Sequence, residues 1–113
     1  MPYDPEQVTY GLTAEAEDFP FEGNVLASGD DALDAEAEQW VREQLDAGNE
    51  WAWCVAVVTA RYPGLPIEGR AVVGGCSYRS AEEFRQDGYY ADMCQEARED
   101  LEQQIREIQE AIG

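Results

Sequence analysis

Two β-prone runs joined by a segment rich in Pro and Gly form the clearest pattern along the chain. Residues 51–62 read WAWCVAVVTARY, residues 67–78 read IEGRAVVGGCSY, and PGLP lies between them. This arrangement predicts a β-hairpin over about residues 51–78. In the first run, large residues alternate with small ones, so the two faces of the strand differ in size. We expect the large face to line the core and the small face to lie close beneath a helix.

A two-stranded hairpin is only marginally stable in water, so the sheet requires a third strand. Two segments of the N-terminal region are candidates, residues 8–12 and residues 24–27, and the pattern leaves both open. Between them, the sequence DFPF at residues 18–21 is typical of a loop with two aromatic anchors.

The apolar residues change to a helical period of about 3.6 after residue 30. The members of this helical stripe recur at i, i+4, i+7, i+8 and i+12: Leu33, Ala37, Trp40, Val41 and Leu45. The sequence SGDD at residues 28–31 supplies preferred N-cap residues, and Gly48 is a suitable C-terminal stop. We therefore expect a helix over about residues 31–47.

A second helical stripe follows the hairpin. Ser80 and Glu83 match a capping box, and we expect Asp87 and Gly88 to end the short helix that this box begins. A long helix then runs over about residues 89–112. Its apolar positions lie three or four residues apart: Tyr90, Cys94, Ala97, Leu101, Ile105, Ile108 and Ile112. At about 1.5 Å per residue the helix is roughly 36 Å long, so it should cross the whole molecule or project beyond it.

These elements predict a single α+β domain over residues 1–113. A small antiparallel sheet, centred on the hairpin, is expected to be packed by the two main helices, 31–47 and 89–112. The tryptophans Trp40, Trp51 and Trp53 fit a core between helix and sheet.

The chain is strongly acidic. Twenty-five Asp and Glu residues face seven basic residues, all of them Arg, for a formal net charge of −18. By segment, the net charge is −13 over residues 1–50, +2 over residues 51–79 and −7 over residues 80–113. Such a field repels nucleic acid and anionic membrane and attracts basic protein surfaces. We therefore expect neither nucleic acid nor a membrane as a direct partner.

The composition disfavours catalysis and cofactor binding. The chain has no His, which is the usual general base and the commonest metal ligand. No P-loop, G-x-S-x-G or G-x-G-x-x-G motif is present, and the acids near Asp30 do not match an EF-hand loop. We expect a non-enzymatic protein without a metal site or cofactor. The chain shows neither a signal-peptide pattern nor a long apolar run, which favours the cytoplasm.

The three cysteines form no C-x-x-C pair. Cys54 and Cys76 come close to each other if the hairpin forms, so a disulfide between them is one alternative. The other alternative is a pair of reduced, buried thiols, which is the usual state of cysteine in a cytoplasmic protein.

Carboxylates on both helices gather opposite the apolar stripes. At about 100° per residue, the acids of the long helix cluster roughly 180° from Leu101, and those of the first helix lie opposite Ala37 and Val41. The candidate binding surface consists of eight acids: Glu36, Glu43, Asp46, Asp92, Glu96, Glu99, Glu107 and Glu110. Such carboxylates recur about every 4.5–6 Å along each axis, which is the scale of nucleic-acid backbone charge.

These acidic faces have three interpretations. In the first, they imitate nucleic acid and occupy the basic groove of a DNA- or RNA-binding protein. In the second, the chain is an acidic structural or regulatory protein that homodimerises through its long helix. In the third, the acids only solvate a salt-adapted domain. Like charges at i, i+4, such as Asp92 and Glu96, are mildly destabilising, so stability alone does not account for the acids of the long helix.

Four segments carry a resemblance to known proteins: residues 23–31 (GNVLASGDD), 51–54 (WAWC), 74–78 (GGCSY) and 88–93 (GYYADM). In these segments the chain resembles a family of small uncharacterised proteins of bacterial phages, prophages and plasmids. In size and acidity it is also similar in kind to phage-encoded anti-CRISPR and other anti-defence proteins, several of which are DNA mimics. The resemblance implies an inhibitor in the bacterial cytoplasm whose partner is a basic nucleic-acid-binding protein, such as a CRISPR effector subunit.

Overall fold

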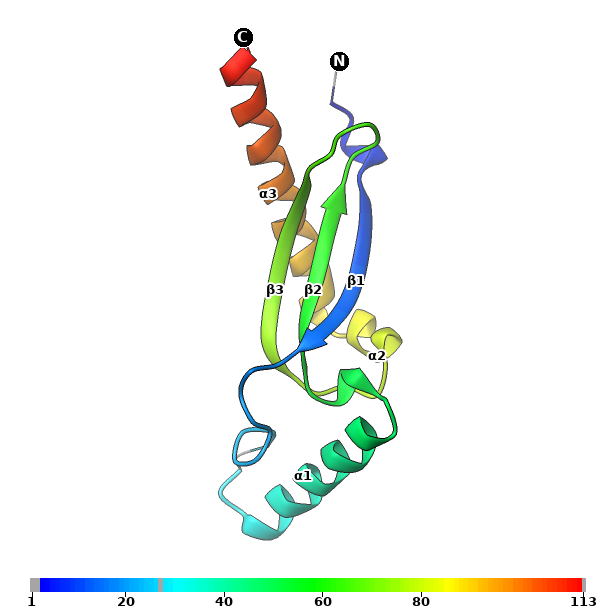
Figure 1. Cartoon of the computed structure of the whole chain (residues 1–113), viewed down its shortest axis with the longest axis vertical. Coiled ribbons are helices and arrows are strands. Elements are labelled where there is room, and N and C mark those ends of the chain that lie inside the picture. The colour runs from blue at the N-terminus through cyan, green and yellow to red at the C-terminus, as the bar shows by residue number, and fades with distance from the viewer. Residues whose placement is uncertain (1–2, 27, 113) are drawn as a thin grey trace.

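A three-stranded antiparallel sheet forms the middle of the molecule in the computed structural model, which describes residues 3–26 and 28–112. Strand β1 is Thr9–Ala16, strand β2 is Cys54–Arg61 and strand β3 is Glu68–Cys76, in the spatial order β1-β2-β3 (Figure 1). Strands β2 and β3 pair as the predicted hairpin, so that prediction is confirmed.

The third strand comes from the first of the two predicted segments. Strand β1 pairs with β2 over its full length and extends beyond the predicted end. Leu12 and Ala14 of β1 pack against the core, and Thr13 between them is exposed, as period-two alternation requires. In the second candidate segment, residues 24–26 form no strand, and Ala27 lies outside the described residues.

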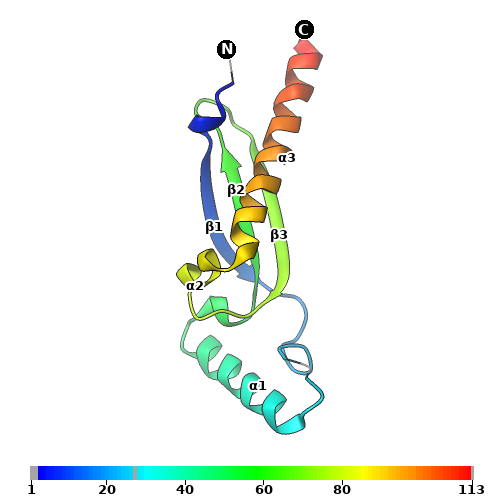
Figure 2. The same ribbon diagram turned by 180° about the vertical axis from the view of Figure 1, so that it is seen from behind.

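The small-residue face of β2 is the face that a helix covers, as predicted. Helix α3 (Gly88–Ile112) runs along this side of the sheet (Figure 2). The strand residues beneath it are at most 1% exposed: Cys54, Ala56, Val58 and Ala60. The helix buries three of its own side chains against them: Met93, Ala97 and Leu101. Because the strand side chains are short, the helix backbone approaches the sheet closely.

At Gly69 of β3 the helix backbone approaches the sheet closely. A Cβ atom added at this position would overlap the carbonyl oxygen of Ala97 and would lie 2.6 Å from the backbone nitrogen of Leu101. Both of these atoms belong to the backbone of α3, so they cannot move aside without moving the helix. The absence of a side chain at Gly69 therefore sets the distance at which α3 packs.

Helix α3 also reaches the outer edge of β3. The carboxylate of Asp100 accepts a hydrogen bond of 2.9 Å from the backbone N–H of Arg70. The side-chain amide of Gln104 donates a hydrogen bond of 2.8 Å to the carbonyl oxygen of Glu68. These bonds satisfy backbone groups that an edge strand would otherwise offer to another chain.

No helix in the described part of the chain covers the opposite, open face of the sheet (Figure 1). The prediction that the large residues of β2 line the core holds at Val57, which is 2% exposed between Thr13 of β1 and Val72 of β3. The prediction is wrong at Val55 and Thr59, which are only half-buried. Helix α3 is the long helix that covers the sheet, and it packs on the small-residue face because closer contact is possible there.

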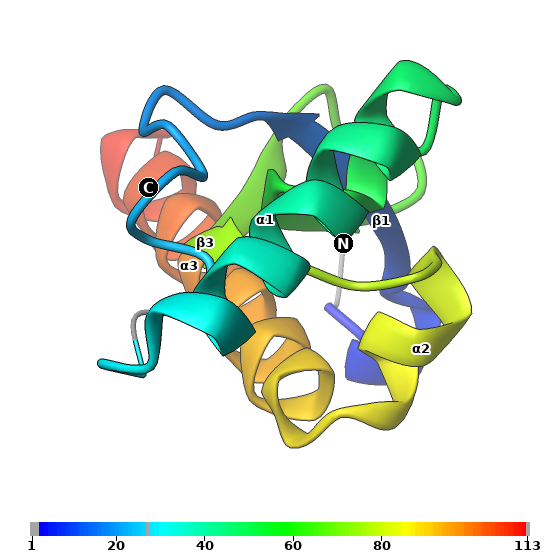
Figure 3. The ribbon, with the colours of Figure 1, turned by 90° about the horizontal axis from the view of Figure 1, so that it is seen from below.

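Helix α1 (Asp31–Asp46) lies beyond one end of the sheet (Figures 1 and 3). The side chain of Asp30 caps it by accepting hydrogen bonds from the backbone N–H groups of Ala32 and Leu33. Gly48, with a φ of +91°, follows its end as expected. The helix bounds agree with the predicted range to within one residue.

Two hydrophobic clusters result from this placement of α1. Val41 of α1 packs with Ala52 and Trp53, which belong to the turn before β2. Trp51 belongs instead to the larger cluster beneath α3, where its ring lies 5.5 Å from that of Phe84. The predicted fold class, a small antiparallel sheet packed by two main helices, is confirmed. Helix α1 makes its contacts at the end of the sheet and not across a face.

The predicted capping box opens helix α2 (Ala81–Gln86), with one difference. The Ser80 hydroxyl accepts a hydrogen bond of 3.2 Å from the N–H of Glu83, whereas the Glu83 carboxylate reaches the N–H of Arg79 and not that of Ser80. Helix α3 then begins at Gly88 and projects beyond the sheet (Figure 1). Ile108 and Ile112, near its end, are 42% and 82% exposed.

The close approach at Gly69 gives a stability prediction. Gly69→Ala is expected to destabilise the protein by about 1–3 kcal/mol, because α3 must move away from the sheet to admit a methyl group. Gly88→Ala is the matched control: its added methyl meets no atom within 4 Å, and it should raise stability by up to about 1 kcal/mol. Urea unfolding followed by tryptophan fluorescence measures both variants. Equal stability of the two variants would contradict the packing described above.

Candidate functional site

All eight acids of the predicted binding surface are exposed, and they fall into two sets. The first set, called the α3 ridge, has five members: Asp92, Glu96, Glu99, Glu107 and Glu110. The second set, called the α1 acids, has three members: Glu36, Glu43 and Asp46. Their exposure agrees with the prediction, which places them opposite the apolar stripe of each helix.

The side of α3 that lies along the sheet (Figure 2) is buried, so the exposed side chains of the α3 ridge point away from the sheet. Two ridge carboxylates accept hydrogen bonds from Gln side chains one turn earlier, Glu99 from Gln95 at 3.2 Å and Glu107 from Gln103 at 3.3 Å. Pairs of this kind stabilise a helix slightly. They restrict the carboxylates without neutralising them.

Little positive charge offsets the ridge. Helix α3 contains seven acids against Arg98 and Arg106, a net charge of −5. The ion pairs among the described residues use other acids: Arg42–Glu22, Arg61–Glu68, Arg70–Glu15 and Arg85–Glu82. Within the described residues, therefore, none of the eight predicted acids takes part in an ion pair.

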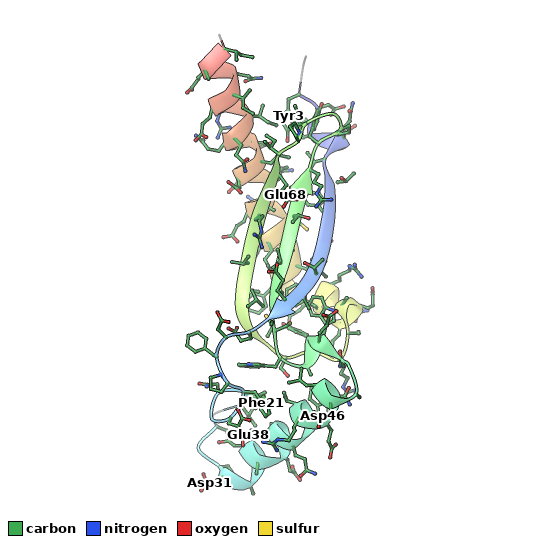
Figure 4. The ribbon with its side chains drawn as sticks, viewed as in Figure 1. Tyr3, Phe21, Asp31, Glu38, Asp46 and Glu68 are labelled. Carbon is green, nitrogen blue, oxygen red and sulfur yellow. The ribbon has the colours of Figure 1, made fainter. Side chains whose placement is uncertain are left out.

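The α1 acids lie toward the other end of the molecule. Helix α1 contains six acids against Arg42, again a net charge of −5, and Figure 4 shows Asp46 on it, far along the long axis from Glu68 of the sheet. The prediction from the sequence treats the eight acids as one negative surface, whereas the structure places them on two separate helices. Helical periodicity gives the exposed face of each helix, but it does not give the position of one helix relative to the other.

Two surface hollows were not predicted from the sequence. One, of about 480 Å³, lies between the loop after β1, Trp53 and the end of α1. The other, of about 200 Å³, lies between the end of α3 and the β2–β3 loop and includes Tyr3, Leu65 and Ile108. The DFPF motif is the signal for the first hollow, because it places two aromatic residues in an otherwise acidic loop.

The three cysteines are free thiols, and the surroundings of Cys54 and Cys76 do not activate them. Cys54 and Cys76 are buried and lie opposite each other in the register of β2 and β3. Burial raises the pKa of the Cys54 thiol to about 12, and it also raises the pKa of Cys76. The thiolate is the nucleophilic form, so neither side chain is prepared for nucleophilic chemistry at neutral pH. Among the described residues, no cluster of His, Cys, Asp and Glu is arranged to hold a metal ion.

No family model, curated protein or solved structure matches this chain. Over residues 3–26 and 28–112, no helix has the length and apolar character needed to cross a membrane.

Burial of the Cys54 thiol should make the stability of the protein depend on pH. The pKa of Cys54 is raised from 9.0 in the unfolded chain to about 12 in the folded protein, so the unfolded state releases its proton first as the pH rises. The contribution of the protonated Cys54 thiol to the free energy of unfolding is therefore complete below pH 9. Above pH 9 this contribution falls by up to about 1.4 kcal/mol per pH unit. Cys54→Ala should flatten the decline in urea midpoint between pH 9 and pH 11. Val57→Ala, which removes a buried group that does not titrate, should lower the midpoint but keep the slope; an unchanged slope in Cys54→Ala would refute this account.

Proposed function

We propose that the protein is a non-enzymatic inhibitor that presents the α3 ridge to a basic nucleic-acid-binding protein in place of DNA or RNA. The observation that supports this proposal is the row of five exposed carboxylates on one side of a long helix, without an ion pair among the described residues. Grooves that hold nucleic acid are lined with Arg and Lys, which contact phosphate. The ridge offers such a groove the opposite charge on a rigid element.

The spacing of the ridge is compatible with this role. From Asp92 to Glu110 the helix rises about 27 Å at 1.5 Å per residue, so the five carboxylates are about 7 Å apart on average. One strand of B-DNA carries a phosphate about every 3.4 Å of helix axis. The ridge therefore has roughly half the linear charge density of one DNA strand. A groove that binds phosphates collectively would attract it over the same range of distances.

The uneven distribution of charge favours a binding role over general salt adaptation. On the open face of the sheet, Glu15 pairs with Arg70 at 3.2 Å and Glu68 pairs with Arg61 at 2.9 Å, so these four charges cancel. If the acids served only to solvate the protein, we would expect unpaired acids on this face as well. The acids are instead concentrated on two helices.

The alternative, homodimerisation through α3, has less support because the protein's own sheet covers most of the apolar stripe. Ala97 and Leu101 are fully buried and Ile105 is half-buried. Ile108 and Ile112 are the large apolar residues of the stripe that stay exposed. Two such side chains are far from the roughly 1,200 Å² that a specific interface usually buries.

An inhibitor of a CRISPR effector, encoded by a phage or another mobile element, is the form of this proposal that the sequence resemblance implies. Such effectors hold nucleic acid in a positively charged channel and recognise its backbone and shape. A protein with the α3 ridge would compete for this channel without being a substrate.

Charge reversal on the ridge tests the proposal directly. The triple variant Glu96→Lys, Glu99→Lys, Glu107→Lys is expected to abolish binding to the target and to leave the fold intact, because all three side chains are exposed. The measurement is a titration against a candidate effector with labelled DNA as competitor, at two salt concentrations. The affinity of the unmodified protein should fall steeply with salt, because the interaction is between opposite charges.

A milder pair of variants separates the ridge from net charge. Glu→Gln at the same three positions raises the net charge by three, and so does Gln→Lys at three exposed positions outside α3: Gln7, Gln39 and Gln86. We expect the first variant to weaken binding by about tenfold or more and the second to change it little. Equal effects, or simultaneous binding of protein and DNA, would leave the acidic face as solvation only.

The end of α3 distinguishes the proposal from its alternative. Ile108→Ser with Ile112→Ser should leave the fold intact and the mass in light scattering unchanged, because neither side chain belongs to the buried core of the monomer. Leu101→Ser, at a fully buried position of the same stripe, should unfold the domain. A wild-type mass of twice 12.6 kDa that halves in the double variant would establish the homodimer instead.

A further inference from the structure

The hollow of about 480 Å³ beside Trp53 has an apolar wall and an acidic rim. The wall consists of Ala16, Phe19, Pro20, Phe21, Leu45 and Trp53. The loop after β1, the turn before β2 and the end of α1 supply these residues, and Figure 4 places Phe21 between α1 and the end of the sheet. Three aromatic residues meeting at one hollow provide ring surfaces for a flat or cationic group.

Hydrogen bonds hold the loop that forms this wall. The carboxylate of Glu17 accepts from the backbone N–H of Asp18 at 3.0 Å and from that of Gly75 at 2.6 Å. The indole N–H of Trp53 donates to the carbonyl oxygen of Phe19 at 2.7 Å. The side chain of Phe19 is nevertheless 71% exposed. Besides this hollow it borders another one, which includes Gly74 and Gly75 of β3. An exposed ring on a loop held in this way is available for contact with another molecule.

Arginines of the protein neutralise only some of the carboxylates on the rim of the hollow. Its carboxylates are Glu15, Glu17, Asp18, Glu22 and Glu50. Glu15 and Glu22 pair with arginines, and Glu17 bonds to backbone N–H groups. Among the described residues, no ion pair involves Asp18 or Glu50. The hollow therefore complements a cation that also has a flat, weakly hydrated face.

The guanidinium group of Arg42 already lies between an aromatic ring and a carboxylate. The guanidinium carbon of Arg42 lies 5.3 Å from the centre of the Phe21 ring, and its Nη2 lies 3.6 Å from Glu22. A ring on one side and a carboxylate on another is the combination that favours Arg over Lys, because guanidinium is planar and weakly hydrated. Phe21 and Glu22 also line the hollow, so Arg42 already uses one of its rings and one of its carboxylates. The groups left for a second guanidinium are the rings of Phe19 and Trp53 and the carboxylates of Asp18 and Glu50.

We propose that this hollow binds an arginine side chain in a basic segment of a partner protein. The aromatic wall would stack on the guanidinium plane, and Asp18 and Glu50 would accept its N–H groups. A second copy of this chain is a poorer occupant, because it would bring a further net charge of −18 to an acidic surface. The inference goes beyond the proposed function, since the hollow is separate from the α3 ridge and requires no imitation of nucleic acid.

The test uses three short peptides that differ at one position. Acetyl-Gly-Gly-X-Gly-Gly-amide is titrated into the ¹⁵N-labelled protein with X as arginine, lysine or citrulline, which has the shape of arginine without its charge. The arginine peptide should shift the indole N–H of Trp53 and the backbone N–H of Gly75 in a saturable way, since both groups lie at this wall. Lysine should bind more weakly, and citrulline should cause no saturable shift.

Variants locate the site. Phe19→Ala should weaken the arginine peptide by about fivefold, and Asp18→Asn with Glu50→Gln should weaken it at least as much. Leu33→Ala removes a comparably exposed apolar side chain from α1 and should change nothing. Binding of citrulline equal to that of arginine, or unchanged affinity in both hollow variants, would overturn the proposal. Shifts confined to the α3 ridge would overturn it too, because they would indicate unspecific attraction of charge.

The outcome is independent of the ridge experiment. The variant with Glu→Gln at Glu96, Glu99 and Glu107 should bind the arginine peptide as the unmodified protein does, because these residues do not line the hollow. Loss of peptide binding in this variant would count against the hollow as the site. Failure of the DNA competition, by contrast, would leave the peptide result unchanged.

Discussion

Helix α3 packs on the sheet at a distance that larger side chains at its centre would prevent. Gly69 leaves room for the helix backbone, and Ala56, Val58 and Ala60 supply a low surface on the neighbouring strand. Full burial of Leu101 contributes about 1.5–3 kcal/mol, and similar terms from its neighbours hold helix and sheet together. The contact also fixes the rotation of α3 about its own axis. The α3 ridge faces solvent because the opposite side of the helix fits closely against the sheet.

This packing holds the α3 ridge on a rigid element of the fold. Asp100 and Gln104 tie α3 to the edge of β3, so the helix is held to an edge of the sheet as well as to a face. A preformed surface loses less conformational entropy on binding than one that must fold first. The loop that carries Phe19 is held in a similar way, by bonds to Gly75 through Glu17 and to the indole of Trp53. Both candidate surfaces are thus positioned by contacts distant in sequence.

Local patterns predict the elements of this fold well, because period and capping are properties of neighbouring residues. The long helix begins one residue before its predicted start, at Gly88, and the capping box at Ser80 forms with a shift of one donor. The exposure of the eight acids follows from the same periodicity. The position of α1, in contrast, depends on Trp53, which packs with Val41 in a cluster apart from the main core. The hollow depends on Phe19 and Trp53, 34 residues apart, and no local pattern pairs them.

The elongated shape explains how the fold tolerates a net charge of −18. The molecule measures 60 × 22 × 21 Å, and the α1 acids lie toward the opposite end of the long axis from the end of α3 (Figure 1). At physiological ionic strength the screening length is about 8 Å, so repulsion between the two ends is largely screened. The remaining repulsion is local, as between Asp92 and Glu96, and costs a few tenths of a kcal/mol per pair, about 0.2–0.5.

The same screening makes the two acidic sets independent of each other toward a partner. A short basic groove would contact one set and gain nothing from the other. A groove nearly as long as the molecule would contact both, and the second contact would then form within the complex at a high effective concentration. Simultaneous contact with the α1 acids and the α3 ridge would therefore require a basic surface that extends along most of the 60 Å length of the molecule.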